Sequence, residues 1–183
     1  GLMQAFETEQ PGFPLMNTSQ SHASGDQSGK LDEESTLLPQ TNNGHELVRI
    51  ERFMLEQLSK NYVLRLGGLV GGKRHPIHFL KGKKNESKPK GKVNLVHRED
   101  VIQAIDFIMK ETLPFGAYNL VSPEHPNRAD FYMKVAEKIQ LSLPTFENTN
   151  ETSGKEVVPS KLIKHGFTFN YQSPFDFPES RAL

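Results

Sequence analysis

The sequence contains no cysteine, and its 22 basic and 22 acidic residues cancel to a formal net charge of zero. Without cysteine the chain has no disulfide, no thiolate metal ligand and no cysteine nucleophile, which fits a cytoplasmic protein. The balanced charge gives no overall attraction to nucleic acid or to a membrane surface. We therefore predict a cytoplasmic protein with no nucleic-acid partner and no membrane partner.

Long apolar runs are also absent. No stretch approaches the roughly 18 apolar residues that a membrane-spanning helix needs. The N-terminal stretch GLMQAFETEQPGFPLMN has neither the basic start nor the continuous apolar run of a signal peptide. Hydrophobic residues make up 35% of the 183 residues, which is enough for the core of one domain, with or without a small appendage.

Apolar residues instead recur in two alternating patterns. Spacings of three and four residues predict helices, and short uninterrupted apolar runs predict buried strands. The predicted helices lie at 45–60, 101–110, 129–141 and 159–165. The predicted strands lie at 13–19, 61–66, 93–97, 115–122 and 167–175. This alternation indicates an α/β protein whose parallel sheet is covered by helices on both faces.

We expect one compact unit with two parts. Residues 1–122 should form the sheet and its helices, and residues 123–183 should form a C-terminal helix and strand extension. The first part includes a loop at 20–44 that is rich in Ser, Asn, Asp and Gly, and loops of this length are often functional or disordered. The segment 81–92 carries six lysines, which predicts a solvated loop, with a basic ligand patch as the alternative.

Three segments carry motifs in a fixed order. The first is GDQSGKLDEESTLLP (25–39). The second is YVLRLGGLVGG (62–72), which follows a helix containing Glu51. The third is NLVHREDVIQAI (94–105), followed by GAYNLV (116–121). With the closing KLIKHGFTFNYQSP, they resemble the C-terminal half of an extended short-chain dehydrogenase/reductase, of the NAD-dependent epimerase/dehydratase family and its bacterial sugar-nucleotide-epimerase-like branch.

The resemblance implies a specific fold and chemistry. The fold would be the later half of a Rossmann-like parallel sheet, with about three main strands flanked by helices and a small C-terminal substrate-side subdomain. The cofactor would be NAD or NADP, and the small-molecule partner would be a nucleotide sugar. The positions near the cofactor would be Arg65, Gly67 and Gly68.

The His-x-x-Asp joint of the third segment closes the substrate cleft in this family, so His97 and Asp100 become candidate substrate-side residues. The Asp100 carboxylate can cap the first turn of the following helix. His97 ends a strand and can face the cleft, with a purely structural hydrogen bond as the alternative. Arg74 can make bidentate contacts to a sugar-nucleotide phosphate, and the alternative is a solvated side chain.

The catalytic residues of the family are replaced in this chain. The family uses a Ser or Thr and a YxxxK pair, in which Tyr is the acid/base and Lys lowers its pKa. Counting along the motifs places the Ser/Thr position on Gln20, with Ser19 and Ser21 beside it. The Tyr and Lys positions fall on Asn43 and Leu47, and neither side chain can do this chemistry.

His45 is a conceivable substitute acid/base, because imidazole titrates near neutrality. The alternative is an exposed residue in the first turn of a helix. The seven histidines are otherwise scattered, and His75 and His78 have no third ligand at a suitable spacing. We therefore predict no metal site.

A glycine-rich loop that leads from a strand into a helix is the family's cofactor cradle. GGLVGG (67–72) follows a predicted strand, but no helical pattern opens after it. We interpret it as a loop after a strand of the later half, and we expect the earlier strands of the family's sheet to be missing from this chain.

Three hypotheses follow. The first is a truncated epimerase-like protein, inactive alone, that keeps substrate-side elements and needs a missing N-terminal half. The second is a non-catalytic interaction module that pairs through its open sheet edge at 13–19. The third is an active NAD(P)-dependent nucleotide-sugar epimerase or dehydratase. Because the edge strand is apolar, we expect a homodimer or marginal solubility.

Overall fold

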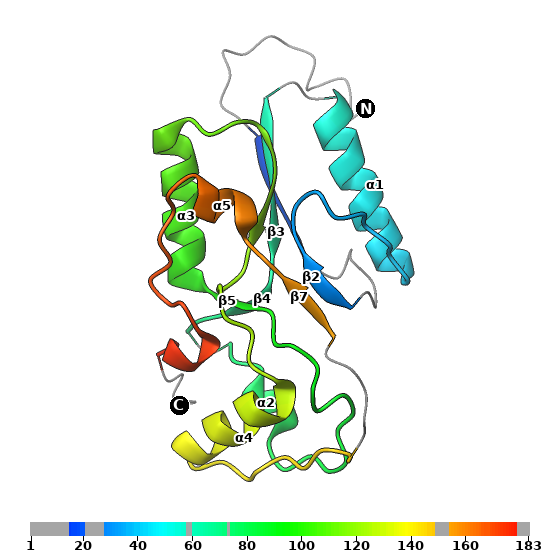
Figure 1. The fold of residues 1–183 in the computed structure, drawn as a ribbon, viewed down its shortest axis with the longest axis vertical. Helices are drawn as coiled ribbons and strands as arrows, with labels where there is room; N and C mark the ends of the chain where they lie inside the picture. Colours follow the sequence, from blue (N-terminus) through cyan, green and yellow to red (C-terminus); the bar gives the residue numbers. More distant parts are fainter. Residues whose placement is uncertain (1–14, 21–27, 58–59, 73, 149–153, 179–183) are drawn as a thin grey trace.

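The computed structural model describes residues 15–20, 28–57, 60–72, 74–148 and 154–178 (Figure 1). In chain order the elements are β1 (Leu15–Gln20), β2 (Gly29–Leu31), α1 (Asn42–Gln57), β3 (Asn61–Leu66), β4 (Gly68–Val70), α2 (Ile77–Leu80), β5 (Leu95–His97), α3 (Arg98–Glu111), β6 (Gly116–Leu120), α4 (Arg128–Lys138), β7 (Lys155–Val157), α5 (Ser160–Lys164) and the 3-10 helix η3 (Pro174–Asp176). The four predicted helices correspond to α1, α3, α4 and α5. No helix in the described part of the chain is both long and apolar enough to cross a membrane.

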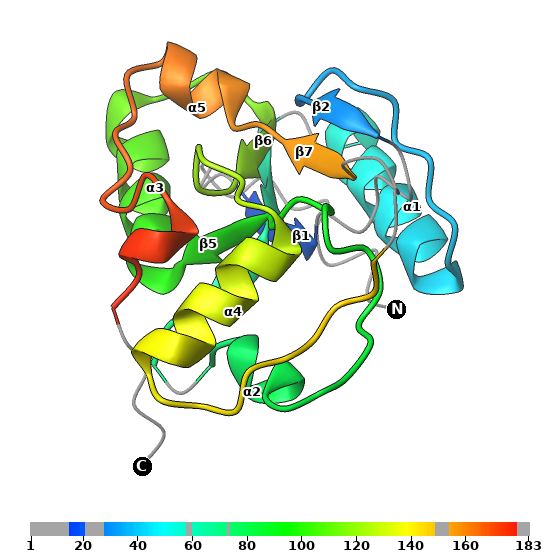
Figure 2. The ribbon, with the colours of Figure 1, turned by 60° about the horizontal axis from the view of Figure 1, so that its bottom comes forward.

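The main sheet is parallel, with the strand order β1-β3-β6. In the middle strand, Val63 pairs with Asn17 on one side and with Ala117 on the other. α1 covers one face of the sheet, and α3 and α5 cover the other (Figures 1 and 2). The predicted fold class, an α/β protein with about three parallel main strands flanked by helices, is confirmed.

Alternate residues of β3 face different helices, as the pleat of a strand requires. Tyr62 and Leu64 join a large core that includes Ile108 of α3 and Leu162 of α5. Val63 points the other way, toward the α1 side. Among the described side chains, the cluster on that side contains Met54, Val63 and Ala117. The two faces of the sheet are therefore covered unequally.

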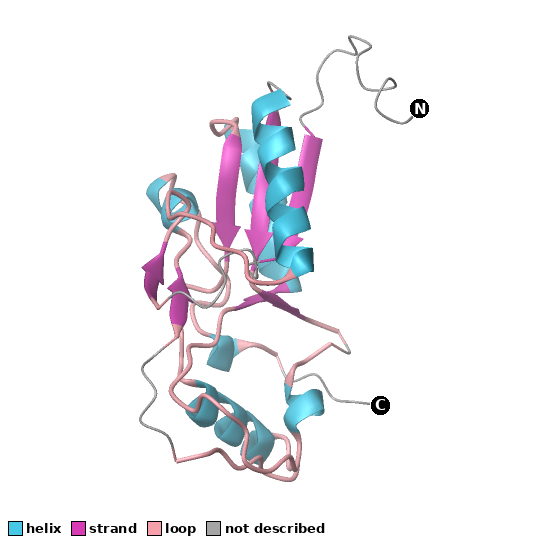
Figure 3. Cartoon of the chain, turned by 90° about the vertical axis from the view of Figure 1, so that its right-hand side faces the viewer, coloured by secondary structure: helices cyan, strands magenta, loops and turns pink. Residues whose placement is uncertain are grey.

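A second layer lies beyond the carboxyl ends of the main strands (Figure 3). We call residues 71–94 and 123–148 the lower lobe. It contains α2 and α4, and its apolar core includes Ile77, Leu80 and Phe131. The strand pair β4-β5 leads from the main sheet into this lobe, because Gly68–Val70 pairs in parallel with Leu95–His97.

Two predictions about irregular segments are wrong. The predicted loop at 20–44 contains β2, which pairs in parallel with β7 (Figure 2). The predicted strand at 167–175 is absent from the structure. Side chains of α3 take its backbone hydrogen bonds instead: Asp100 accepts from the Asn170 N–H, and Gln103 donates to the Thr168 carbonyl. These bonds replace a strand ladder.

Three apolar side chains of α1 are partly exposed among its charged residues. The spacing of apolar residues correctly predicts this helix, and Met54 is buried against the sheet. Ile50 and Phe53 are each 44% exposed, however, and Leu55 is 39% exposed. β1, beside this helix, forms the edge of the main sheet in the described residues. An open strand edge with exposed apolar side chains beside it is typical of a surface that another polypeptide covers.

We expect the purified chain to self-associate through this surface. Replacing Phe53 with Lys should shift the species seen by sedimentation velocity toward monomer, because a charge in an apolar contact must be desolvated. The matched control is Ile102→Lys on α3, where the apolar side chain is 60% exposed but lies on the other side of the sheet. A wild-type chain that sediments as a monomer and melts cooperatively would contradict the prediction.

Candidate functional site

The candidate site is the joint at which β5 runs into α3. His97 ends the strand and is the N-cap of the helix, where its Nδ1 accepts the Glu99 N–H at 3.3 Å. Nε2 therefore carries the ring proton in the neutral form. That nitrogen faces Gly71, where a Cβ atom would lie only 3.4 Å away. Burial lowers the pKa of His97, so the neutral form is favoured.

Asp100 has a different role from the predicted one. His97 already caps α3, so the expectation that Asp100 is the N-cap is wrong. The Asp100 side chain is fully buried, and its Oδ1 accepts the Asn170 N–H at 2.6 Å. Its Oδ2 has no hydrogen-bond partner within the described residues. Burial raises the pKa of this carboxyl, which acts as an anchor for the C-terminal segment.

The C-terminal segment 167–178 covers the joint, and we call it the strap. The Tyr171 hydroxyl donates to Glu99 Oε2 at 2.7 Å, and the Tyr171 ring meets the His97 ring edge-on with centroids 4.6 Å apart. The Phe177 ring also packs against His97, with the two ring centroids 5.5 Å apart. The strap therefore restricts solvent access to His97, which is only 4% exposed.

Arg65, a candidate cofactor-binding residue, is held inside the protein. Its Nη2 lies 2.5 Å from Glu51 Oε1, and its Nη1 donates to the Glu33 carbonyl at 3.1 Å. Both partners are buried, and Arg65 itself is 8% exposed. The guanidinium therefore joins the middle strand to α1 and to the segment after β2. In this arrangement most of its donors are already used by the protein.

Glu33 has a structural role that the sequence did not predict. Its Oε1 accepts two backbone N–H groups, from Asn119 of β6 and from Lys161 of α5, each at 3.1 Å. Through Arg65 it is also connected to Glu51. In the sequence, Glu33 is marked only by its place in the acidic pair Asp32-Glu33 of the first motif. The spacing of residues does not identify the groups that it binds.

The other predicted site residues lie apart from the joint. Ser19 is in β1, with its backbone paired to Arg65, and Ser21 lies outside the described residues. His45 is exposed in the first turn of α1, a helix on the opposite side of the sheet from α3. Arg74 is exposed in the turn after β4, where its N–H donates to the Gly71 carbonyl. Of these four, Arg74 is the one bonded to Gly71, the glycine that faces His97.

The glycines at 67 and 68 serve packing between strands. A Cβ at Gly67 would lie 2.9 Å from the Asn94 carbonyl oxygen, and one at Gly68 would lie 2.6 Å from Leu95 Cδ2. Both positions need glycine so that the backbone can approach β5 closely. Gly68–Val70 is the strand β4, and no helix opens directly after it. This segment does not fit the pyrophosphate of a dinucleotide, which binds where a glycine-rich loop meets a helix N-terminus.

Two further histidines are buried in the lower lobe. His75 accepts the Ile77 N–H with its Nδ1 at 3.1 Å and stacks on Phe131. Burial, and to a lesser degree the nearby His78, lowers the pKa of His75 to about 4. Burial also lowers the pKa of His125. The described residues contain no group of three His, Asp or Glu side chains that could hold a metal ion.

The chain resembles known proteins in sequence and in fold. No model of a known protein family matches the chain. The chain is 35% identical over 161 residues to protein YeeZ of Escherichia coli, from strain K12 and from O157:H7. The match covers 87% of this chain and 58% of YeeZ, so the chain spans little more than half the length of the curated relatives it matches.

Solved structures share the fold at lower identity. The Bordetella bronchiseptica enzyme WbmG, in complex with NAD and UDP, matches with a TM-score of 0.70 and 19% identity, over 90% of this chain and 55% of WbmG. The UDP-N-acetylglucosamine 4-epimerase from Bacillus cereus matches with a TM-score of 0.70 and 14% identity, over 85% of this chain and 61% of the epimerase. The resemblance drawn from the sequence motifs is thus confirmed for the fold.

Glu51 should be essential for stability. Glu51→Gln removes the carboxylate that compensates buried Arg65, so we expect a loss on the order of 3 kcal/mol in the free energy of unfolding. The matched control is Glu46→Gln, which breaks the exposed Glu46–Arg49 pair on the same helix and should change stability by less than about 0.5 kcal/mol. Urea denaturation measures both, and equal effects of the two substitutions would refute the role of the buried pair.

Stability should also fall in mild acid because of His75. Its pKa is lowered from 6.5 to about 4 by folding, so its contribution is present above pH 6.5 and is lost as the pH falls toward 4. For this side chain the loss is on the order of 3 kcal/mol. His75→Asn cannot ionise but can still accept the Ile77 N–H, so its unfolding free energy should fall less over this range. Exposed His45→Asn, the control, should behave as wild type in urea titrations at each pH.

Proposed function

Because the chain has the fold of sugar-nucleotide epimerases over part of their length, we propose that it forms the substrate-side part of an NAD(P)-dependent epimerase/dehydratase-like protein and binds a nucleotide sugar. The observation that carries the proposal is the joint of His97, which lies where the main sheet meets the lower lobe. In an α/β sheet, ligands bind outside the carboxyl ends of the strands, and this joint is at that end.

The joint offers suitable groups for such a ligand. His97 Nε2 keeps its proton, and no described residue accepts a hydrogen bond from it. It can donate to a hydroxyl or phosphate oxygen, provided that the strap over the ring opens to admit the ligand. Arg74, exposed in the adjacent turn, adds a planar guanidinium that suits a phosphate. Neutral His97 and cationic Arg74 would therefore bind and orient a sugar nucleotide without moving a proton.

We further propose that the chain has no independent redox activity. The glycines of 67–72 do not fit a dinucleotide. Asn43 and Leu47 occupy the places of the family's Tyr and Lys, and both lie in the first turns of α1. A complete enzyme would need a glycine-rich loop from residues other than those described. The fold alone, and none of these side chains, supports NAD or NADP use.

A thermal melt with ligands tests the proposal. UDP-glucose or UDP-N-acetylglucosamine, at about 100 times the dissociation constant, should add about 2.7 kcal/mol of stability, a shift of a few degrees for a domain of this size. NADH and NADPH should produce no shift. His97→Asn removes the Nε2 donor and should weaken the sugar-nucleotide shift, whereas His45→Asn should leave it unchanged.

Two outcomes would contradict parts of this proposal. A shift with NADH or NADPH would mean that a dinucleotide site exists, and the absence of redox activity would have to be abandoned. No shift with any sugar nucleotide would remove the substrate-side function. In that case the second candidate, an interaction module, is favoured by the exposed apolar side chains of α1 beside the edge of β1.

A further inference from the structure

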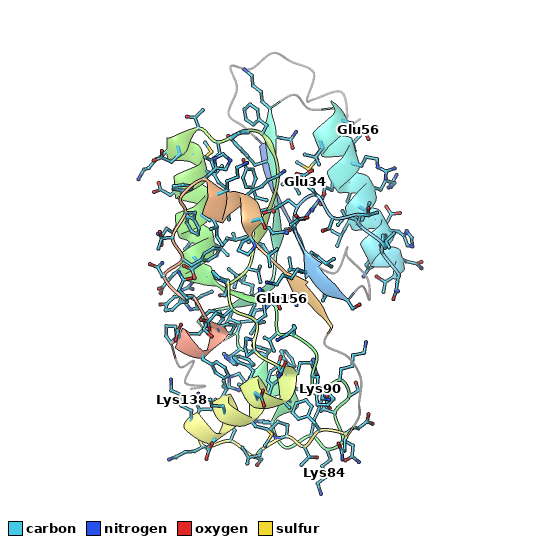
Figure 4. All side chains as sticks on the ribbon, in the orientation of Figure 1. Glu34, Glu56, Lys84, Lys90, Lys138 and Glu156 are labelled. Atoms are coloured by element: carbon cyan, nitrogen blue, oxygen red, sulfur yellow. The ribbon has the colours of Figure 1, made fainter. Side chains whose placement is uncertain are left out.

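The zero net charge conceals two oppositely charged regions. The lower lobe contains 11 Lys and Arg but 5 Asp and Glu, whereas the rest of the chain contains 11 and 17. Figure 4 shows Lys84 and Lys138 at the lower end of the molecule and Glu34 and Glu56 toward the upper end. The lower lobe therefore has a positive field of its own, although the whole chain is neutral.

The basic segment 81–92 is held in one conformation. The Gly82 N–H donates to the Ser142 carbonyl at 2.8 Å, and the Thr145 N–H donates to the Lys83 carbonyl at 2.9 Å. The segment therefore runs beside the chain that follows α4. The segment is a loop with solvated side chains, as predicted, but hydrogen bonds fix its backbone. Its lysines are therefore held close to one another at the surface.

These lysines keep their charge available. Among the described residues, no ion pair with another side chain involves five of the six lysines of the segment: Lys81, Lys83, Lys84, Lys90 and Lys92. Those at 81, 83 and 84 are exposed. Closely spaced cations without acidic partners repel each other, and an external anion relieves that repulsion.

Exposed apolar side chains lie beside the same lysines. Phe79 is 73% exposed, the largest exposure among the large hydrophobic residues described, and it stands two residues before Lys81. Leu143 is 50% exposed and follows Ser142, which is bonded to Gly82. The backbone contacts thus bring a protruding aromatic ring, an aliphatic side chain and a group of lysines to one end of the lobe.

We propose that the lower lobe docks on the surface of an anionic lipid bilayer. The lysines attract the anionic headgroups, and Phe79 and Leu143 enter the boundary between headgroups and acyl chains, as apolar side chains of surface-bound proteins do. A nucleic acid would satisfy the lysines but would leave Leu143 without an apolar environment. This proposal replaces the prediction of no membrane partner, and it is independent of nucleotide-sugar binding.

Vesicle sedimentation tests the proposal with the full chain. Vesicles of phosphatidylcholine containing about one quarter phosphatidylserine should bind the protein, and vesicles of phosphatidylcholine alone should not. Binding should weaken as salt is raised from about 0.05 M to about 0.5 M, because the headgroup attraction is screened. Retention of the protein on neutral vesicles, or no retention on anionic ones, would overturn the proposal.

Substitutions separate the two components. Each lysine near an anionic surface contributes about fivefold to binding, so Lys83→Ala with Lys84→Ala should reduce it about 25-fold. The matched control is the pair Lys60→Ala and Lys164→Ala, exposed lysines outside the lobe, which should have little effect. Thermal melts check that every variant is folded.

Phe79→Ala should reduce vesicle binding severalfold, and Ile102→Ala, at a similarly exposed apolar side chain on α3, should not. If Phe79→Ala binds as wild type, the ring does not enter the bilayer and the proposal falls.

Fluorescence anisotropy with a short DNA duplex provides the remaining comparison. Binding to the duplex without binding to anionic vesicles would identify a nucleic-acid surface and overturn the lipid assignment.

Discussion

The ionic group around Arg65 is the constraint on which the architecture depends. A guanidinium in the middle strand of a parallel sheet must find partners without water, or burial of its charge becomes very costly. Glu51 supplies the compensating carboxylate from α1, and the Glu33 carbonyl accepts a further hydrogen bond. Glu33 then binds backbone groups of β6 and α5. Arg65 thus fixes α1 and the segment after β2 relative to β3. Through Glu33, the same group also holds β6 and α5.

The sequence predicts regular elements well because their signals are local. The apolar runs that became β3, β5 and β6, and the periodic segments that became α1, α3 and α4, need no knowledge of distant residues. The joint was located from its motif, but the roles within it were not. Asp100 looked like a helix cap because its distant partner, Asn170, is invisible to local pattern. The strand predicted at 167–175 was wrong for the same reason, because side chains of α3 bind the backbone there.

The two apolar surfaces of the chain differ in their electrostatic surroundings. Helix α1 lies on the acidic part of the chain, and its exposed Ile50, Phe53 and Leu55 suit a protein neighbour with its own packed surface. The lower lobe combines isolated apolar side chains with lysines, which suits a fluid, anionic layer. With the joint of His97 between them, the three contacts that we propose, with protein, with a nucleotide sugar and with lipid, fall on separate parts of the molecule.

Glu33 also determines when the fold can be completed. Its side chain bonds Asn119 and Lys161, which lie 86 and 128 positions later in the chain. The pairing of β2 with β7 spans a comparable separation. Closing such long loops costs conformational entropy before any contact is gained, which slows folding. During synthesis on the ribosome, the hydrogen bonds of the Glu33 side chain therefore remain incomplete until α5 has emerged. Until then Glu33 lacks the Lys161 donor, and the nascent chain depends on the packing of β3 and α1.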